Sequence, residues 1–188
     1  MEWENGFSHM KKVIAVIACS VLLLFSLRPT ENTLMECALG SEIKIFSATN
    51  CMSYFNLFGV SDDLNTHLNE TYNLSSLLNS PTEYKFFFAE KLIDGGYNIN
   101  EEVGSSGLPI HSAIINNDTQ TLKWLLDRGA NPSTVDSISN MNAYEFIEFM
   151  QHKNSTPERE EMRKILQDAY LSWVLGQSNN INKNEKQP

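Results

Sequence analysis

The stretch Gly-Leu-Pro-Ile-His-Ser-Ala at residues 107–113, followed by Leu-Leu-Asp-Arg-Gly-Ala-Asn-Pro at residues 125–132, decides the fold of this chain. Its second half has a counterpart upstream, because residues 92–100 (Leu-Ile-Asp-Gly-Gly-Tyr-Asn-Ile-Asn) align with residues 125–133. In each copy a glycine, Gly96 or Gly129, follows an apolar pair, as it does where a helix ends in a residue with positive φ. The chain therefore repeats a helical unit, and the distance from Leu92 to Leu125 is its period.

The pattern resembles the ankyrin repeat, which has the same period of about 33 residues and begins with Thr-Pro-Leu-His-x-Ala. The residues that carry the resemblance are Pro109, His111, Ala113, Leu125, Leu126, Gly129 and Ala130. Leu108 replaces the usual threonine and Ile114 replaces the second alanine, so the repeat has diverged. The resemblance implies an all-α solenoid, in which each helix pair buries its apolar face against its neighbours. It also implies that His111 links adjacent turns through hydrogen bonds.

A third unit follows, because Asn-Ala-Tyr-Glu-Phe-Ile at residues 142–147 resembles the start of a closing repeat. Ile165 lies farther beyond Leu125 than one period, so we expect an insertion at positions 151–157. The expected organisation is an export segment (1–28), a linker with an N-terminal helical extension (29–60), an ankyrin-repeat domain of about three repeats (61–176) and a disordered tail (177–188). Within the extension, residues 29–40 are predicted to be the linker.

Local signals place the helix ends. Ser-Pro-Thr-Glu at residues 80–83 is a capping box and predicts a helix from there to about Asp94. Asn117 is suited to a left-handed helix end. Asp118 and Thr156 are expected to begin the helices that follow them.

The first residues read as an export signal. Lys11 and Lys12 precede an uncharged run of 15 residues, 13–27, which would cover roughly 22 Å of a hydrocarbon core about 30 Å thick. Three fates stay open: an uncleaved signal anchor, cleavage after Gly40, or lipoprotein processing at Cys19. Both Met1 and Met10 are candidate start residues. The two lysines place the body outside the cytoplasm, at the bacterial inner membrane or free in the periplasm.

Export changes the interpretation of two cysteines. Cys37 and Cys51 lie 14 residues apart and are compatible with a disulfide in an oxidising periplasm. Two free buried thiols are the alternative, because sequence does not show whether their Cα atoms approach closely enough. Cleavage after Gly40 would exclude the pairing.

Charge narrows the class of partner. The net charge is −9, and beyond Pro29 the chain has 11 Lys/Arg against 21 Asp/Glu. An acidic body repels nucleic acid and anionic membrane surfaces and favours encounter with a basic protein. The expected membrane contact is therefore made by the N-terminal segment alone.

No catalytic constellation is found in the sequence. The four histidines are scattered, and neither clustered metal ligands, a phosphate loop nor a nucleophile elbow occurs. We therefore predict no catalytic residue, no metal site and no cofactor.

The resemblance implies a concave binding surface made of two hairpin fingers, residues 97–106 and 131–140, together with the first helix of each pair. Aromatic and arginine residues dominate interface hot spots. The candidate contact residues are Tyr97, Asn98, Glu101, Glu102, Arg128, Asn131 and Tyr144.

Small exported repeat proteins of this layout resemble immunity proteins, which neutralise toxins such as phospholipase effectors delivered by neighbouring cells through type VI secretion. We therefore expect a non-enzymatic inhibitor of a toxic protein. The alternatives are a scaffold that binds an envelope enzyme without inhibiting it, and an unrecognised hydrolase. The partner's identity and the oligomeric state stay open.

Overall fold

The computed structural model describes residues 12–18, 29–40, 47–64, 66, 73–102 and 107–184, and no strand occurs among them. The chain is all-α, as predicted. Besides helical stretches at residues 12–18 and 62–64, the helices of the described part are α2 (Glu31–Ala38), α3 (Ala48–Phe58), α5 (Leu74–Leu78), α6 (Lys85–Asp94), α7 (Pro109–Ile115), α8 (Thr119–Asp127), α9 (Ala143–Lys153) and α10 (Pro157–Asn184).

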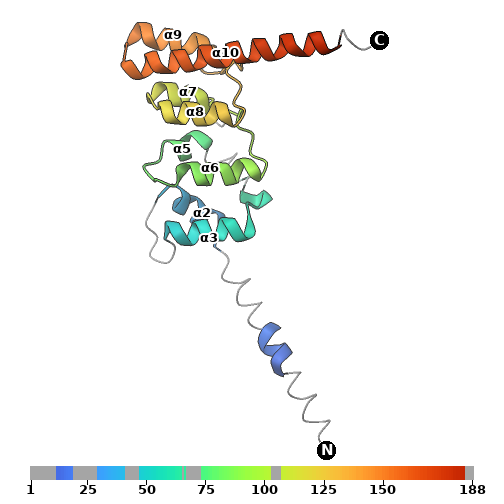
Figure 1. Cartoon of the computed structure of the whole chain (residues 1–188). Coiled ribbons are helices and arrows are strands. Elements are labelled where there is room, and N and C mark those ends of the chain that lie inside the picture. Colours follow the sequence, from blue (N-terminus) through green and yellow to red (C-terminus); the bar gives the residue numbers. More distant parts are fainter. Residues whose placement is uncertain are drawn as a thin grey trace, which may run out of the picture.

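The helices form pairs that stack one upon the next (Figure 1). Within the pairs, α2 contacts α3, α5 contacts α6, α7 contacts α8 and α9 contacts α10. Between pairs, the first helices form one row, α5–α7–α9, and the second helices form another, α6–α8–α10 by position, with direct contact between α8 and α10. Each pair is therefore stabilised by its neighbours, in a solenoid-like arrangement.

The period of the sequence is also a period of backbone geometry. Gly96 and Gly129 end their helices with φ of 99° and 88°. The following residue then donates its N–H back into the helix, from Tyr97 to the Leu92 carbonyl at 3.0 Å and from Ala130 to the Leu125 carbonyl at 2.9 Å. The two helix ends are thus the same structure, built twice.

The core runs through the whole stack. Leu92 of α6, Leu125 of α8 and Leu166 of α10 are 2%, 0% and 1% exposed, so each second helix buries a leucine. Burying one such side chain stabilises the fold by about 1.5–3 kcal/mol. The predicted insertion in the last unit is accommodated partly in its first helix, since α9 has 11 residues where α7 has 7.

Residues 29–40 are not the linker that we predicted. They contain α2, which Thr30 caps by accepting a hydrogen bond from the Thr33 N–H. Leu34, Met35 and Ala38 are 5%, 1% and 2% exposed. Their spacing of one, three and four residues gives the helix an apolar face, and α3 covers that face.

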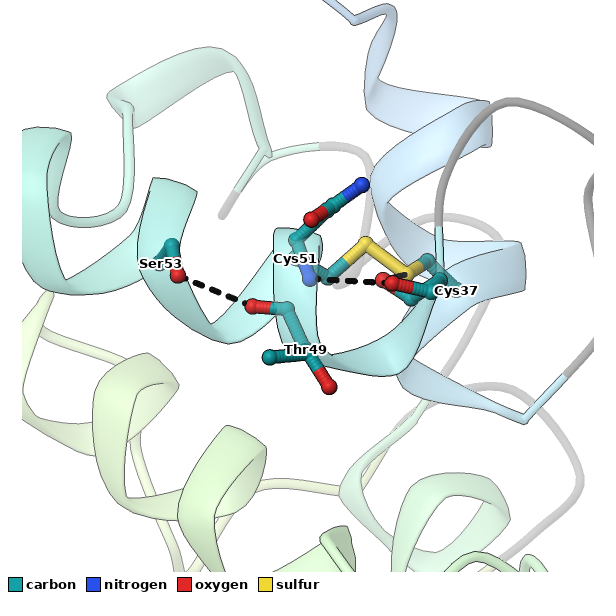
Figure 2. Close-up of a disulfide and its surroundings, with 6 residues drawn as sticks. Cys37, Thr49, Cys51 and Ser53 are labelled. Atoms are coloured by element: carbon teal, nitrogen blue, oxygen red, sulfur yellow. Dashed lines mark hydrogen bonds between the residues drawn. A yellow bond between two sulfur atoms is a disulfide. The ribbon is translucent and has the colours of Figure 1, made fainter.

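The structure joins Cys37 of α2 to Cys51 of α3 in a disulfide with Cα atoms 6.5 Å apart (Figure 2). Both residues are buried, at 1% and 0% exposure. Around the bridge, Ser47 caps α3 and its carbonyl accepts the Cys51 N–H at 3.1 Å. Of the two arrangements that the sequence left open, the structure contains the bridged one.

Two helix limits differ from the prediction. The predicted helix after Ser80 begins only at Lys85, because residues 80–84 form turns and the capping box is not made; its end at Asp94 is as predicted. The predicted disordered tail is helical as far as Asn184, since α10 continues without a break, and residues 185–188 lie outside the described part. Extending an existing helix needs no new nucleus, which favours helix even in a polar sequence.

Residues 12–18 of the predicted export segment are helical, and Ile14 and Ile17 are exposed there. The remainder of the apolar run, Cys19, and both candidate start residues lie outside the described residues. Among the residues that are described, no helix has the length and apolar character that crossing a membrane requires.

Candidate partner-binding surface

Residues 131–140, which we call the central finger, are folded around the buried carboxylate of Asp136. Its Oδ1 accepts the N–H groups of Ser139 at 2.7 Å and Ile138 at 3.2 Å. The backbone N–H of Asp136 donates to the Met141 carbonyl at 3.0 Å, and Asn140 ends the loop in a left-handed conformation with φ of 54°. The carboxylate therefore organises the second half of the loop.

The same carboxylate joins the central finger to the preceding unit. Asp136 Oδ2 accepts the N–H of Leu108 at 2.8 Å, at the start of α7. Gly107 makes this approach possible, because it has φ of 62° and a Cβ there would overlap Asp136 Oδ2. Burial raises the pKa of Asp136, but the N–H donors of Ser139 and Leu108 outweigh burial, so that its pKa lies below the ordinary value. Asp136 is therefore ionised and structural.

The described part of the first finger, residues 97–102, is bonded side by side to the central finger. Asn100 Oδ1 accepts the Asn131 N–H at 2.7 Å, and Glu102 accepts the Ser137 N–H at 2.6 Å and bonds the Ser137 hydroxyl. Asn98 and Asn131 make the same turn, each accepting the N–H two residues later at 3.0 Å. The described part of the first finger and the central finger are therefore bonded into one continuous surface.

His111 is buried next to this surface. The residue is 3% exposed, and the centre of its ring lies 4.7 Å from that of Phe146. Its Nε2 is 3.0 Å from the carbonyl oxygen of Met141, in the next unit. Burial lowers the pKa of His111, and the nearby charge of Asp136 opposes this only in part. The imidazole is therefore held neutral, in a position that links α7 to the start of α9.

Three predicted contact residues are exposed on the fingers: Asn98, Glu101 and Asn131. Glu102 is half-buried and bonded to Ser137, so it positions the central finger. These residues are the part of the predicted contact set that the structure brings together.

Tyr97 is not an available anchor, which corrects the prediction. Its side chain is 3% exposed, and its hydroxyl accepts the Leu74 N–H at 3.2 Å. Burial raises the pKa of Tyr97, although the hydrogen bond from Leu74 opposes that effect. The ring replaces the small residue found at the equivalent Ala130 and fills the space beside the short helix α5.

Arg128 lies at the end of α8, just before the central finger, but its side chain is bonded to the row of second helices. Its Nε is 2.6 Å from Glu90 of α6, and its guanidinium lies 5.3 Å from the Trp124 ring centre. It therefore ties α8 to α6. Tyr144 lies at the last layer of the stack, half-buried against Tyr170 with ring centres 5.7 Å apart, beside an open apolar hollow of about 510 Å³ that Gln167 and Leu171 also line.

Sequence reasoning missed the apolar side chains that the surface presents. Val135 and Ile138 on the central finger are 58% and 57% exposed, and Ile115 of α7 is 52% exposed. No local signal marks these residues, because exposure of an apolar side chain depends on what the rest of the fold covers. Together they give the fingers and first helices an apolar component that a partner can bury.

Basic residues are segregated from this surface. Residues 92–122 and 129–152, which hold the fingers and most of the first helices of two units, contain no Lys or Arg. Many of the basic residues lie on the second helices instead, where they form ion pairs such as Lys85–Asp118 at 2.9 Å and Lys123–Glu161 at 2.8 Å. Glu101 and Glu145 are exposed without such compensation nearby in sequence, so the surface is acidic.

Within the described ranges, no group of three or more His, Cys, Asp or Glu side chains is arranged to hold a metal ion. No family model, curated protein or solved structure matches this chain.

Proposed function

We propose that this chain is an exported ankyrin-type solenoid, without enzymatic activity of its own, that binds a protein partner through its fingers and first helices. The observation that carries the proposal is the recurrence, in two successive units, of one helix end and one asparagine-bonded turn. Repeats of this kind present extended surfaces for other proteins. The acidic fingers with exposed Val135 and Ile138 are chemically suited to that role.

The proposed partner is a toxic protein that this chain inhibits in the bacterial periplasm, as an immunity protein to an effector such as a phospholipase. The apolar run behind Lys11 and Lys12 supports export, and the Cys37–Cys51 bridge supports an oxidising compartment. An acidic inhibitor surface also favours rapid capture of a basic target.

A site-specific crosslinking experiment tests the binding surface. A photoreactive residue replaces Val135 or Ile138 in the full chain, expressed in the bacterium that encodes it. The matched control carries it at Gln120, which is exposed on α8. We expect one protein to be crosslinked from positions 135 and 138 and not from position 120. Crosslinking from position 120 alone would place the interface on the second helices.

The activity of the captured protein then separates inhibitor from scaffold. We expect a stoichiometric amount of the purified chain to abolish the partner's toxicity and turnover. A partner that binds with unchanged turnover would identify the chain as an envelope scaffold. If the purified chain instead hydrolyses a substrate without any partner, and mutation of a finger residue abolishes that activity, the hydrolase alternative is supported.

A further inference from the structure

Helix α2 belongs to the folded body. Four of its residues, Leu34, Met35, Cys37 and Ala38, are at most 5% exposed. They pack against α3, and the row of stacked pairs begins with them (Figure 1). A solenoid needs a capping unit at each end, because its terminal unit has a neighbour on one side only. The α2–α3 pair is that unit at the N-terminal end.

The disulfide gives this cap a covalent closure. Cys37 and Cys51 are both buried, and the bridge joins the two helices across a sequence separation of 14 residues (Figure 2). A bridge across a loop of this length restricts the unfolded chain and stabilises the fold. Without Cys37, the Cys51 thiol would be left unpaired in the core.

Gly40 is packed against the same body. It has φ of 85°, and a Cβ at this position would lie 3.2 Å from Thr82 Cβ in the segment that leads into α6. Its N–H donates to the Cys37 carbonyl at 3.1 Å. Gly40 therefore closes the end of α2, the first helix of the cap, in contact with the second unit.

We infer that the peptide bond after Gly40 stays intact in the mature protein and that α2, bridged to Cys51, is its permanent N-terminal cap. The inference rests on the proposed export. Ala38 and Gly40 have the small side chains of a signal-peptidase site. Hydrolysis of that bond during export, before the bridge forms, would, however, remove the four buried residues of α2 together with the partner of Cys51. Any removal of the export segment therefore occurs upstream of Pro29.

One digest tests both parts of the inference. The full chain is expressed in a bacterial host and isolated from the fraction that contains it, envelope or cytosol. Its free thiols are blocked, and it is cleaved after glutamate without reduction. Glu36 and Glu42 then release residues 37–42, which span the Gly40–Ser41 bond, while Cys51 lies in residues 43–70. We expect mass spectrometry to find these two peptides joined by a disulfide. A peptide that begins at Ser41 would overturn the inference.

If the peptide 37–42 is intact but Cys37 and Cys51 both carry the blocking group, the two cysteines are not bridged and the bridged cap is overturned. If the chain is then found in the cytosolic fraction, the export part of the proposed function fails as well. A chain that begins at Ser41 and still inhibits its partner would overturn the inference alone. The two failures are thus distinguishable.

Thermal unfolding provides a second test. We expect Cys51→Ser to lower the melting temperature of the full chain by roughly 6–12 °C, the effect of losing one bridge of this loop length in a domain of this size. A reductant should lower the wild-type melting temperature by a similar amount and leave that of the variant unchanged. Cys19→Ser, outside the bridge, is the matched control and should have no effect. An equal response of Cys51→Ser and wild type to reductant would contradict the bridged cap.

Discussion

Asp136 and Gly107 show how one pair of residues sets the geometry of the proposed binding surface. The carboxylate accepts three backbone N–H groups, two from its own finger and one from Leu108 of the preceding unit. Hydrogen bonds to an ionised group are worth about 1.5–3 kcal/mol each. The absence of a side chain at Gly107 lets the carboxylate reach that third donor.

Gly107→Ala is therefore expected to destabilise the chain by roughly 2–4 kcal/mol, from left-handed strain and a weakened bond to Asp136. Gly129→Ala is the control. Gly129 also has a positive φ, of 88°, but no atom lies within 4 Å of the position that a Cβ would occupy. This substitution should cost only about 1 kcal/mol. Urea unfolding of both variants checks this, and equal losses would contradict the contact with Asp136.

The stability of the chain should also fall with acid in two stages. The pKa of His111 is lowered by burial, so the unfolded chain binds its proton more readily. Its contribution is present above about pH 6.5 and is lost as the pH falls below that value. The pKa of Asp136 is lowered as well, since its N–H donors outweigh burial, and its contribution is lost only below about pH 4.

His111→Gln should remove the first stage and keep the second. Denaturant unfolding at neutral pH, near pH 5 and below pH 4 measures both. An unchanged loss of stability between neutral pH and pH 5 in this variant would show that another group is responsible.

Different side chains stabilise the central finger and cover its outer surface. Asp136 and Glu102 hold the loop through hydrogen bonds, whereas the apolar side chains of Val135 and Ile138 are exposed to solvent. Substituting an exposed side chain of this kind usually changes the free energy of unfolding by no more than about 0.5 kcal/mol. In an interface, the same side chains can lose all their exposed surface.

Val135→Ser combined with Ile138→Ser should therefore weaken binding of the captured partner at least tenfold, or about 1.4 kcal/mol, with little change in stability. Leu57→Ser on α3, at a residue that is 75% exposed, is the control. Calorimetric titration and thermal unfolding measure the two quantities. Equal affinity of both variants would remove the central finger from the interface.

At the scale of the whole molecule, the segregation of charge is the dominant feature. Several basic side chains of the second helices form ion pairs, whereas the fingers contain acidic and no basic residues. Complementary charge mainly accelerates association, and salt screens it. The association rate with a basic partner should therefore fall with ionic strength.

Glu101→Lys should lower that association rate several-fold at low salt and leave the dissociation rate nearly unchanged. Lys164→Glu on α10, away from the fingers, is the control. Stopped-flow binding at low and high ionic strength distinguishes the two variants. A rate that is independent of salt in the wild type would contradict electrostatic capture.

Much of the fold follows from local sequence. Glycine at positions 96 and 129 marks the helix ends, and Asp118 and Asn117 lie at the turn between α7 and α8 as predicted. These features depend on residues within one turn of each other, so a short stretch contains all their physical causes. The period of the repeat follows from the same signals, because it is the distance between the two glycines.

The rest was decided by contacts between distant residues. Only the stacked pairs convert residues 29–40 from an apparent linker into a buried cap, and only their arrangement brings Cys37 to Cys51. Tyr97 is bonded to Leu74 of α5, 23 residues before it, and Asp136 is bonded to Leu108, 28 residues before it, so the roles of both depend on distant parts of the chain. The helical repeat can therefore be inferred from the sequence, because helix ends depend on nearby residues. Which side chains form the core and which lie on the surface follows only from the folded structure, because burial depends on every neighbour at once.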